Sequence, residues 1–240
     1  MNGANFLENL FRETFFFREA IYEPLLNALI WLYDTVALHE LGLAIILLTI
    51  LVRLIIYPLF HQGIKYQRII QELRPELDKI KTKHKSNREA QTKATLELFK
   101  KYKLNPLAPF LSLIVQLPLF LGLYVIFLNG FGETIEPWLY SFTPRPGELN
   151  QTFFGLINLK ETSLIIAVLA ALAQYFQARL TFTSSSTPAM RVVMLYFLPG
   201  LILVALFKFP AALGLYWLTT TIFSIIQQAI VNRRFTKAPL

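Results

Sequence analysis

The chain has 240 residues, of which 55% are hydrophobic and 16% are charged, and its formal net charge is +8. A soluble domain carries roughly 25% charged residues, so this composition favours one compact domain within a membrane, without a second large domain. The absence of cysteine excludes disulfides, thiolate metal sites and cysteine nucleophiles, and we expect no lipid-modified N-terminal cysteine.

The N-terminal segment, 1–40, shows the pattern of an amphipathic helix rather than that of a signal peptide. One face carries Phe6, Leu10, Phe17, Ile21, Leu25, Ala28 and Leu32, and the opposite face carries Glu8, Arg12, Glu19 and Glu23. We expect an extracytoplasmic helix that lies in the membrane interface and bends at Pro24. A helix packed against the rest of the molecule is the alternative.

Five apolar stretches approach the length that crosses a hydrocarbon core of about 30 Å. They are 41–60, 106–128, 163–180, 191–207 and 210–231. We therefore predict an all-α integral membrane protein with five transmembrane helices. An extracytoplasmic loop, 129–162, joins the second span to the group of three in 163–231, and a short tail, 232–240, follows.

The stretch between the first two spans, 61–105, is the most polar part of the chain. It holds twelve Lys or Arg residues against five Asp or Glu residues. Apolar side chains recur there at helical spacing on both sides of a break near 85–88, which predicts a helical hairpin. A solvated charged face is the simpler explanation, but 45 residues are long for a mere connection.

The distribution of basic residues predicts the orientation. The hairpin, the loop 181–190 with its flanking arginines, and the tail hold 17 of the 23 Lys and Arg residues. The positive-inside rule then places the N-terminus outside and the C-terminus in the cytoplasm, which five spans permit. This distribution fits membrane topology, so we expect no sequence-specific binding of nucleic acid. The lack of an Arg/Ser-rich presequence favours a bacterial plasma membrane.

Arg53 lies inside the first span, seven residues before Phe60 at its cytoplasmic end. A rise of about 1.5 Å per residue puts it on the order of 10 Å deep. An arginine at a helix centre costs on the order of 2.5–3.5 kcal/mol, and none of the predicted spans contains an acidic partner. The side chain either extends to the cytoplasmic surface or lines a hydrated cavity.

Other spans supply polar residues for such a cavity. They are Thr49, one turn before Arg53, together with Gln116, Gln174, Gln177, Thr219, Thr220, Thr221, Ser224, Gln227 and Gln228. The predicted topology places most of them in the cytoplasmic half of the bilayer. We expect an unpaired cation in a polar groove, which attracts acidic or hydrophilic peptide segments and small anions. The three scattered histidines and the lack of a glycine-rich phosphate loop predict no metal, no cofactor and no enzymatic activity.

Three segments share a pattern with a known family, in the same chain order. LELFKKYKLNPLAPFLSLIVQLPLFLGLYVIF at 96–127 has a basic helix end, Asn-Pro, and a span with Gln-hydrophobic-Pro. FPAALGLYWLTTTIFSIIQQAIVNRR at 209–234 matches a last span, and Arg53 with Pro58 forms Arg-x-x-x-x-Pro. With the charged hairpin between the first two spans, the chain resembles the YidC/Oxa/Alb membrane protein insertases over about 20–235.

The resemblance implies five helices around a hydrophilic groove that opens to the cytoplasm and the lipid and is closed outside. Arg53 then corresponds to the groove arginine, Thr49 to a polar position one turn earlier, and Trp217 to an aromatic position facing the groove. The expected client-binding set is Arg53, Thr49, Gln116, Gln174, Trp217, Thr220 and Ser224. We expect neither the large extracytoplasmic domain nor the long ribosome-binding tail of some members, and we therefore expect ribosome contact through the hairpin and the loop 181–190.

These expectations combine into one hypothesis. The protein is an insertase and chaperone that passes hydrophilic segments of nascent membrane proteins through the groove and releases their helices into membrane lipids, alone or beside a Sec-type translocon. A small anion-binding channel or transporter, with Arg53 as its solute site, is the alternative. A scaffold that only gathers partners through the hairpin is a third interpretation.

Overall fold

The computed structural model describes residues 17–104, 108–129, 135–145, 147, 149–181 and 191–237, and this part of the chain is almost entirely helical. The predicted all-α class is confirmed. In chain order the elements are η1 Arg18–Tyr22, α3 Glu23–Thr35, α4 Leu41–Ile55, α5 Tyr57–Glu72, α6 Arg74–Lys83, α7 Arg88–Lys101, α8 Ala108–Asn129, η2 Glu136–Trp138, β1 Thr152–Phe153, β2 Ile157–Asn158, α9 Leu164–Thr181, η3 Val193–Phe197, α11 Leu198–Leu206 and α12 Ala211–Lys237.

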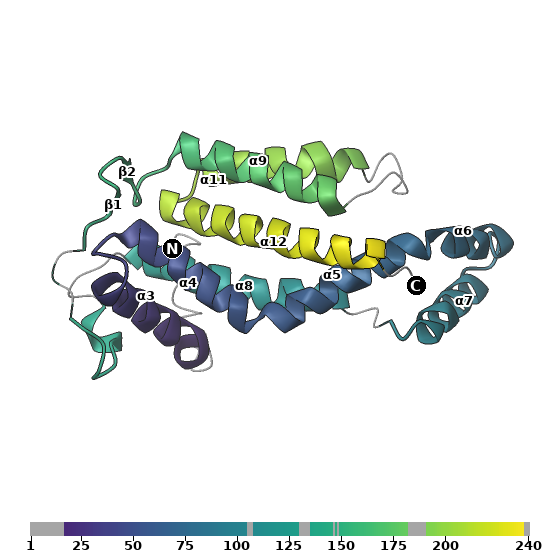
Figure 1. Cartoon of the computed structure of the whole chain (residues 1–240), viewed down its shortest axis with the longest axis horizontal. Coiled ribbons are helices and arrows are strands. Elements are labelled where there is room, and N and C mark those ends of the chain that lie inside the picture. Colours follow the sequence, from purple (N-terminus) through teal and green to yellow (C-terminus); the bar gives the residue numbers. More distant parts are fainter. Residues whose placement is uncertain are drawn as a thin grey trace, which may run out of the picture.

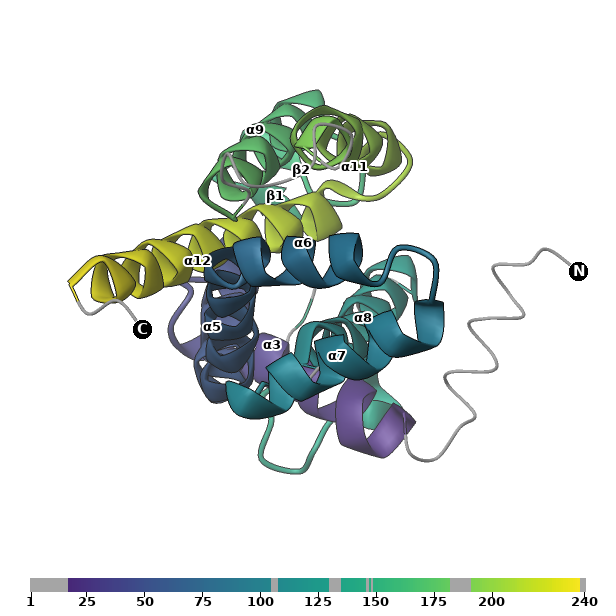
Figure 2. The ribbon, with the colours of Figure 1, turned by 90° about the vertical axis from the view of Figure 1, so that its right-hand side faces the viewer.

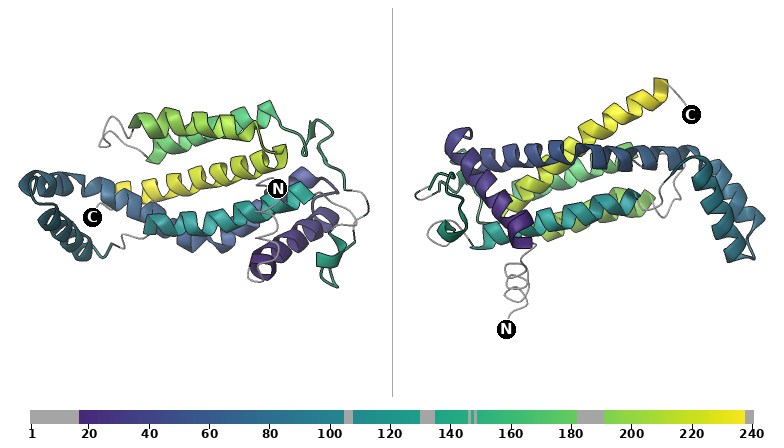
Figure 3. Two further views of the ribbon diagram at one scale, coloured as in Figure 1. Left: turned by 180° about the vertical axis from the view of Figure 1, so that it is seen from behind. Right: turned by 90° about the horizontal axis from the view of Figure 1, so that it is seen from below.

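Helix α12 runs through the middle of an elongated bundle. It packs against α9 on one side and against α4 on the other, and α8 packs against α5 (Figure 1). Helix α11 packs on α9, and the two form an outer layer that the view from behind also shows (Figure 3). Most buried apolar side chains belong to one core between α3, α4, α8 and α12.

All five expected spans fall on apolar helical segments. Two of them, Leu164–Thr181 and Ala211–Arg233, are long and apolar enough to cross a membrane as single helices. The bent pair α4 and α5 is a third candidate, and Val115–Phe127 and Val193–Leu206 are shorter apolar helices within the described residues. An integral membrane protein accounts for the many large apolar side chains that these helices leave exposed.

The first expected span, 41–60, is a bent element. Helices α4 and α5 meet at Ile56 and differ in direction by 69°. Pro58 lies in the first turn of α5, where its missing N–H and its ring favour a kink or break in the helix. The bend turns α5 along α8, and α5 continues to Glu72, where the hairpin begins.

The polar stretch after α5 forms a helical hairpin of α6 and α7 at one end of the bundle (Figure 2). The two helices are separated by a turn at 84–87, close to the predicted break. The side chain of Asn87 accepts a hydrogen bond of 3.0 Å from the N–H of Ala90 and so caps α7. The hydroxyl of Tyr102 donates to Glu76 at 3.2 Å and ties the second helix to the first.

The N-terminal helical segment packs against the bundle over its described residues. A π-helical turn, η1, leads directly into α3, and Pro24 lies in the first turn of α3. Leu26, Leu29 and Ile30 are fully buried, which matches the alternative of a packed helix. The residues before Phe17, including Phe6 and Leu10, lie outside the described part, so an interfacial helix there stays a prediction.

The described part of the loop 129–162 folds over the end of the bundle opposite the hairpin (Figure 1). Asn27 of α3 is 3% exposed and binds this loop at three points. Its side-chain oxygen accepts from the N–H of Tyr140 at 2.7 Å and from the hydroxyl of Thr143 at 2.6 Å. Its amide group donates to the carbonyl of Trp138 at 2.9 Å. These bonds hold the loop against α3.

Candidate functional site: a polar groove beside Arg53

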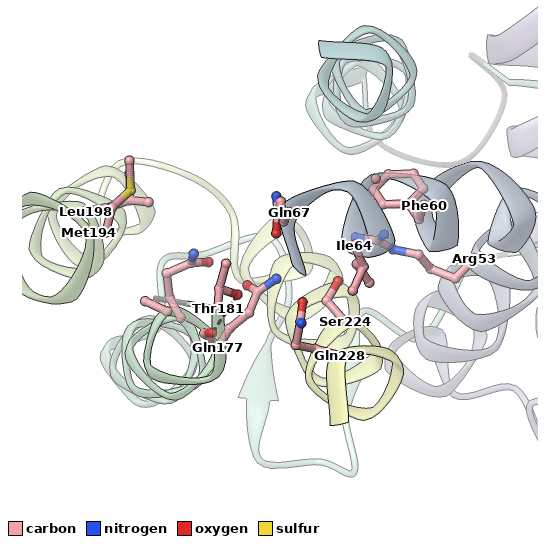
Figure 4. A pocket seen from close by; sticks show the side chains of 13 residues that line it. Arg53, Phe60, Ile64, Gln67, Gln177, Thr181, Met194, Leu198, Ser224 and Gln228 are labelled. Atoms are coloured by element: carbon pink, nitrogen blue, oxygen red, sulfur yellow. Dashed lines mark hydrogen bonds between the residues drawn. The ribbon is translucent and has the colours of Figure 1, made fainter. Parts of the chain in front are cut away.

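A cavity of about 260 Å³ lies between the α4–α5 bend, the α9–α11 layer and α12 (Figure 4). It occupies the half of the bundle that leads to the α6–α7 hairpin. Polar and apolar side chains share its wall. The lining residues are Arg53, Phe60, Gly63, Ile64, Gln67, Gln174, Gln177, Ala178, Thr181, Met194, Leu198, Ser224 and Gln228.

Arg53 is in the last turn of α4 and is 5% exposed. Its Nη2 donates to Oε1 of Gln116 over 3.4 Å, and its guanidinium carbon lies 4.2 Å from the centroid of the Phe60 ring. Its Nη1 is buried without a hydrogen-bond partner. An unsatisfied buried donor costs about 1–3 kcal/mol, and more for a charged group. The guanidinium therefore has one hydrogen-bond donor that no described residue accepts.

Gln116 connects three helices around this cation. Its side chain is on α8, accepts from Arg53 of α4 and donates through Nε2 to the hydroxyl of Tyr216 on α12. Tyr216 is buried in the main apolar core. Arg53 is thus oriented by an amide that is itself fixed from the opposite side.

The opposite wall of the cavity comes from α9 and α12. Gln174 of α9 accepts a hydrogen bond from Nε1 of Trp217 at 3.4 Å. Gly214 of α12 lies so close to Ile166 that a Cβ atom there would be 2.7 Å from Cγ2 of Ile166. This close approach brings the polar side chains of the two helices to one wall.

The end of the cavity nearest the hairpin is bounded by side-chain contacts to the C-terminus of α9. Gln71 of α5 donates to the carbonyl of Thr181, and Asn232 of α12 donates to the carbonyl of Leu180 at 3.4 Å. The last carbonyls of a helix have no partner within it. These two side chains therefore satisfy groups that α9 leaves free, and they link α9 to the end of α5 and to α12.

The seven residues expected to bind clients divide into three groups. Arg53, Gln174 and Ser224 line the cavity. Gln116 and Trp217 contact these lining residues but are not part of the wall. The remaining two are buried threonines, Thr49 and Thr220. The hydroxyl of Thr49 donates to the carbonyl of Ile45 at 2.6 Å, and the carbonyl of Thr220 accepts from Ser224. Their role in client binding stays a prediction.

Two features of the site are absent from the expected set. Phe60, Ile64 and Gln67 line the cavity with Arg53, and their spacing of seven, four and three residues is that of one helix face. This spacing is visible in the sequence. Phe60 was, however, expected to end the first span, and Ile64 and Gln67 were assigned to the hairpin with the rest of 61–105. Tyr216 has no such signal, because its role depends on contact with Gln116, 100 positions away.

The known proteins to which this chain is similar belong to one group of membrane proteins. The sequence profile of the 60Kd inner membrane protein family matches residues 31–238. The protein named Membrane protein insertase YidC from Geobacter metallireducens is 29% identical over 216 residues, which cover 90% of this chain and 37% of that protein. The protein of the same name from Anaeromyxobacter sp. is 31% identical over 215 residues, which cover 90% of this chain and 36% of that protein. The protein of that name from Oceanobacillus iheyensis is 34% identical over 204 residues, which cover 80% of this chain and 74% of that protein. The chain thus spans little more than a third of the first two.

Proposed function

The chain belongs to the 60Kd inner membrane protein family, that of the YidC/Oxa/Alb insertases which its sequence resembles, and we propose that it is a membrane protein insertase. Nascent membrane proteins are its clients, and a bacterial plasma membrane is its location. The observation that carries the proposal is Arg53, a buried cation whose Nη1 has no partner, in the wall of a polar cavity.

The groove lowers the barrier for the polar part of a client. A hydrophilic segment that enters the hydrocarbon region without partners loses several kcal/mol for each polar group. The amides of Gln67, Gln174, Gln177 and Gln228 line the cavity and offer both donors and acceptors to such a segment. Arg53 adds a cation, which favours acidic segments and carbonyl groups.

The client's apolar helix leaves by a different face. Leu54 and Ile55, directly after Arg53, are exposed apolar residues on α4, so the cavity wall adjoins a surface that lipid covers. Burial of the client helix in lipid contributes about 25 cal/mol per Å² of apolar area. This free energy drives release, and neither ATP nor a covalent step is required.

The proposed orientation puts the α6–α7 hairpin, the loop 181–190 and the C-terminus in the cytoplasm, and η1 and the β1–β2 hairpin outside. It rests on the bias of Lys and Arg toward the first group of segments. The α6–α7 hairpin is then the surface available to a ribosome, and a Sec-type translocon would meet the bundle from the side.

The test is insertion of single-span clients by cells or vesicles that contain only Arg53→Ala, Arg53→Lys or the wild-type chain. We expect Arg53→Ala to insert clients with acidic translocated segments about tenfold less efficiently, which corresponds to about 1.4 kcal/mol. Arg53→Lys keeps the charge and retains most of the activity. Arg179→Ala, an exposed arginine of α9 outside the cavity wall, is the matched control.

Full activity of Arg53→Ala on every client, acidic and neutral, at equal protein level would contradict a cationic groove. The alternative of an anion channel or transporter is tested in the same vesicles by efflux of chloride and phosphate. Its support is the same buried guanidinium, whose Nη1 has no hydrogen-bond partner. Anion flux that disappears with Arg53→Ala, without any insertion activity of the wild-type chain, would replace the insertase proposal.

A further inference from the structure

The tip of the β1–β2 hairpin exposes two large apolar side chains at the end of the bundle opposite α6 and α7 (Figure 1). Phe154 is 61% exposed and Leu156 is 86% exposed. The hairpin is short, with Thr152 paired to Asn158 and Phe153 to Ile157. Apolar residues at such a tip are unfavourable in water, so the tip requires an apolar neighbour or carries a free-energy cost.

The backbone of this turn adds a second observation. The N–H of Leu156 donates to the carbonyl of Phe153 at 3.0 Å, and both central residues are left-handed, with φ of +49° at Phe154 and +68° at Gly155. Turns of this kind in water favour Asn or Asp before the glycine. A bulky residue such as phenylalanine is strained there. Phe154 therefore occupies a position where Asn or Asp would be more favourable in water.

The turn is held firmly against α4. Its Phe154 N–H donates to the Glu40 carboxylate at 3.0 Å, and Glu40 directly precedes α4. The ring of Phe153 lies on Gly42, where a Cβ atom would be 2.1 Å from Cδ2 of the ring. The tip is thus a fixed projection from the first turn of α4.

The residues directly after β2 fix the position of the hairpin along the axis of α12. The N–H of Ala212 donates to the carbonyl of Leu159 at 3.0 Å, and that of Ala211 donates to the carbonyl of Glu161 at 2.7 Å. The hairpin is therefore level with the first turns of both α4 and α12. Both helices are apolar from these turns onward, so we place the boundary between hydrocarbon and headgroups at this level.

We propose that Phe154 and Leu156 insert into the headgroup–acyl boundary of the leaflet at this end of the bundle and act as a lipid anchor. Phenylalanine and leucine are typical of the apolar face of interfacial segments, and the buried apolar area sets the binding strength of such anchors. Helix α9 starts eight residues after Leu156, and its first residues, Leu164 and Ile165, are also exposed apolar side chains. It rests on the membrane location of the chain and not on its insertase activity.

Single-cysteine labelling tests the anchor, because the chain has no cysteine of its own. Leu156→Cys, in the full chain reconstituted in phosphatidylcholine–phosphatidylglycerol vesicles, carries an environment-sensitive fluorophore. Ser86→Cys, an exposed position in the turn between α6 and α7, gives the aqueous reference, and Ile165→Cys of α9 gives the lipid reference. All three positions are exposed, so the labels leave the core intact.

We expect the label at 156 to emit at shorter wavelength than that at 86, to be quenched by lipids brominated near the headgroup, and to resist iodide. Phe154→Asn should shift it toward iodide access, since it removes one anchoring side chain and relieves the turn. Iodide quenching at 156 equal to that at 86, without quenching by brominated lipid, would overturn the anchor. Protection that disappears on dilution of protein in the lipid would also overturn it, in favour of a second copy of the chain.

Discussion

The guanidinium carbon of Arg53 lies 4.2 Å from the centre of the Phe60 ring, although the two residues are seven positions apart. Seven residues of a straight helix rise about 10.5 Å. The 69° bend between α4 and α5 changes this geometry and brings the ring over the cation. Arg53 is therefore shielded by the same element that continues to the base of the α6–α7 hairpin.

This relationship predicts an energetic coupling between Arg53 and Phe60. A double-mutant cycle with Arg53→Met and Phe60→Leu keeps apolar bulk at both positions and removes the charge and the ring. We expect a coupling of about 0.5–2 kcal/mol, the range of cation–π pairs from exposed to desolvated. The measurement is the free energy of unfolding in mixed detergent micelles. Additive effects of the two changes would show that the contact contributes nothing.

The sequence predicted those parts of the site whose signals are local. An arginine inside an apolar run is visible in a short stretch of sequence, and so is the polar break near 85–88. Arg53 could be identified on that basis, and three of the seven expected residues line the cavity. Pro58 was identified only as part of the Arg-x-x-x-x-Pro pattern, and the direction of the bend there depends on how α5 packs against α8.

The other parts depend on contacts between distant segments. Thr49 shares a helix face with Arg53, yet a helical threonine can bond its own chain four residues back, and its hydroxyl does so at Ile45. Gln116 was expected among the groove residues, whereas its second partner, Tyr216, follows only from the packing of α8 against α12. Spacing along one helix cannot distinguish a side chain in the wall from one behind it.

Gln116 and Tyr216 are expected to differ in importance although they share a hydrogen bond. Gln116→Leu removes the acceptor from the buried guanidinium and leaves it with an additional unsatisfied donor, which costs on the order of 1–3 kcal/mol or more. Tyr216→Phe removes one neutral hydrogen bond, for about 0.5–1.5 kcal/mol. Gln62→Leu, at an exposed position of α5, should change stability by less than about 0.5 kcal/mol.

The free energy of unfolding and client insertion are measured for these three variants together. We expect Gln116→Leu to reduce insertion of acidic clients more than Tyr216→Phe does, because only the first loosens Arg53 directly. Equal losses for the two variants would indicate that Tyr216 acts on the site by itself rather than through Gln116.

The contact between α9 and α12 predicts opposite outcomes for two glycines. Gly214→Ala places a Cβ atom 2.7 Å from Cγ2 of Ile166, whereas nothing lies within 4 Å of a Cβ atom at Gly200 of α11. Overpacking of this kind costs about 1–3 kcal/mol, so Gly214→Ala should destabilise the protein and Gly200→Ala should not. Leucine branches one carbon farther from the backbone than isoleucine. The double variant Gly214→Ala/Ile166→Leu should therefore recover part of the stability that Gly214→Ala loses. Thermal unfolding in detergent measures all four proteins, and equal tolerance of both alanines would contradict a tight contact.

The hydrogen bonds of Asn27 predict that this residue holds the loop 129–162 against α3. Asn27→Leu leaves the N–H of Tyr140, the hydroxyl of Thr143 and the carbonyl of Trp138 without their buried partner. Each such group costs about 1–3 kcal/mol, so we expect a loss of at least about 3 kcal/mol and faster proteolysis within 135–145. Asn27→Asp retains an acceptor for Tyr140 and Thr143 but not the donor to Trp138, and should lie between Asn27→Leu and the wild type. Thr143→Val removes a single bond and is the smallest change in the series. If Asn27→Leu were as resistant to protease as Thr143→Val, the loop would be held by its apolar contacts, with Asn27 contributing no more than one hydrogen bond.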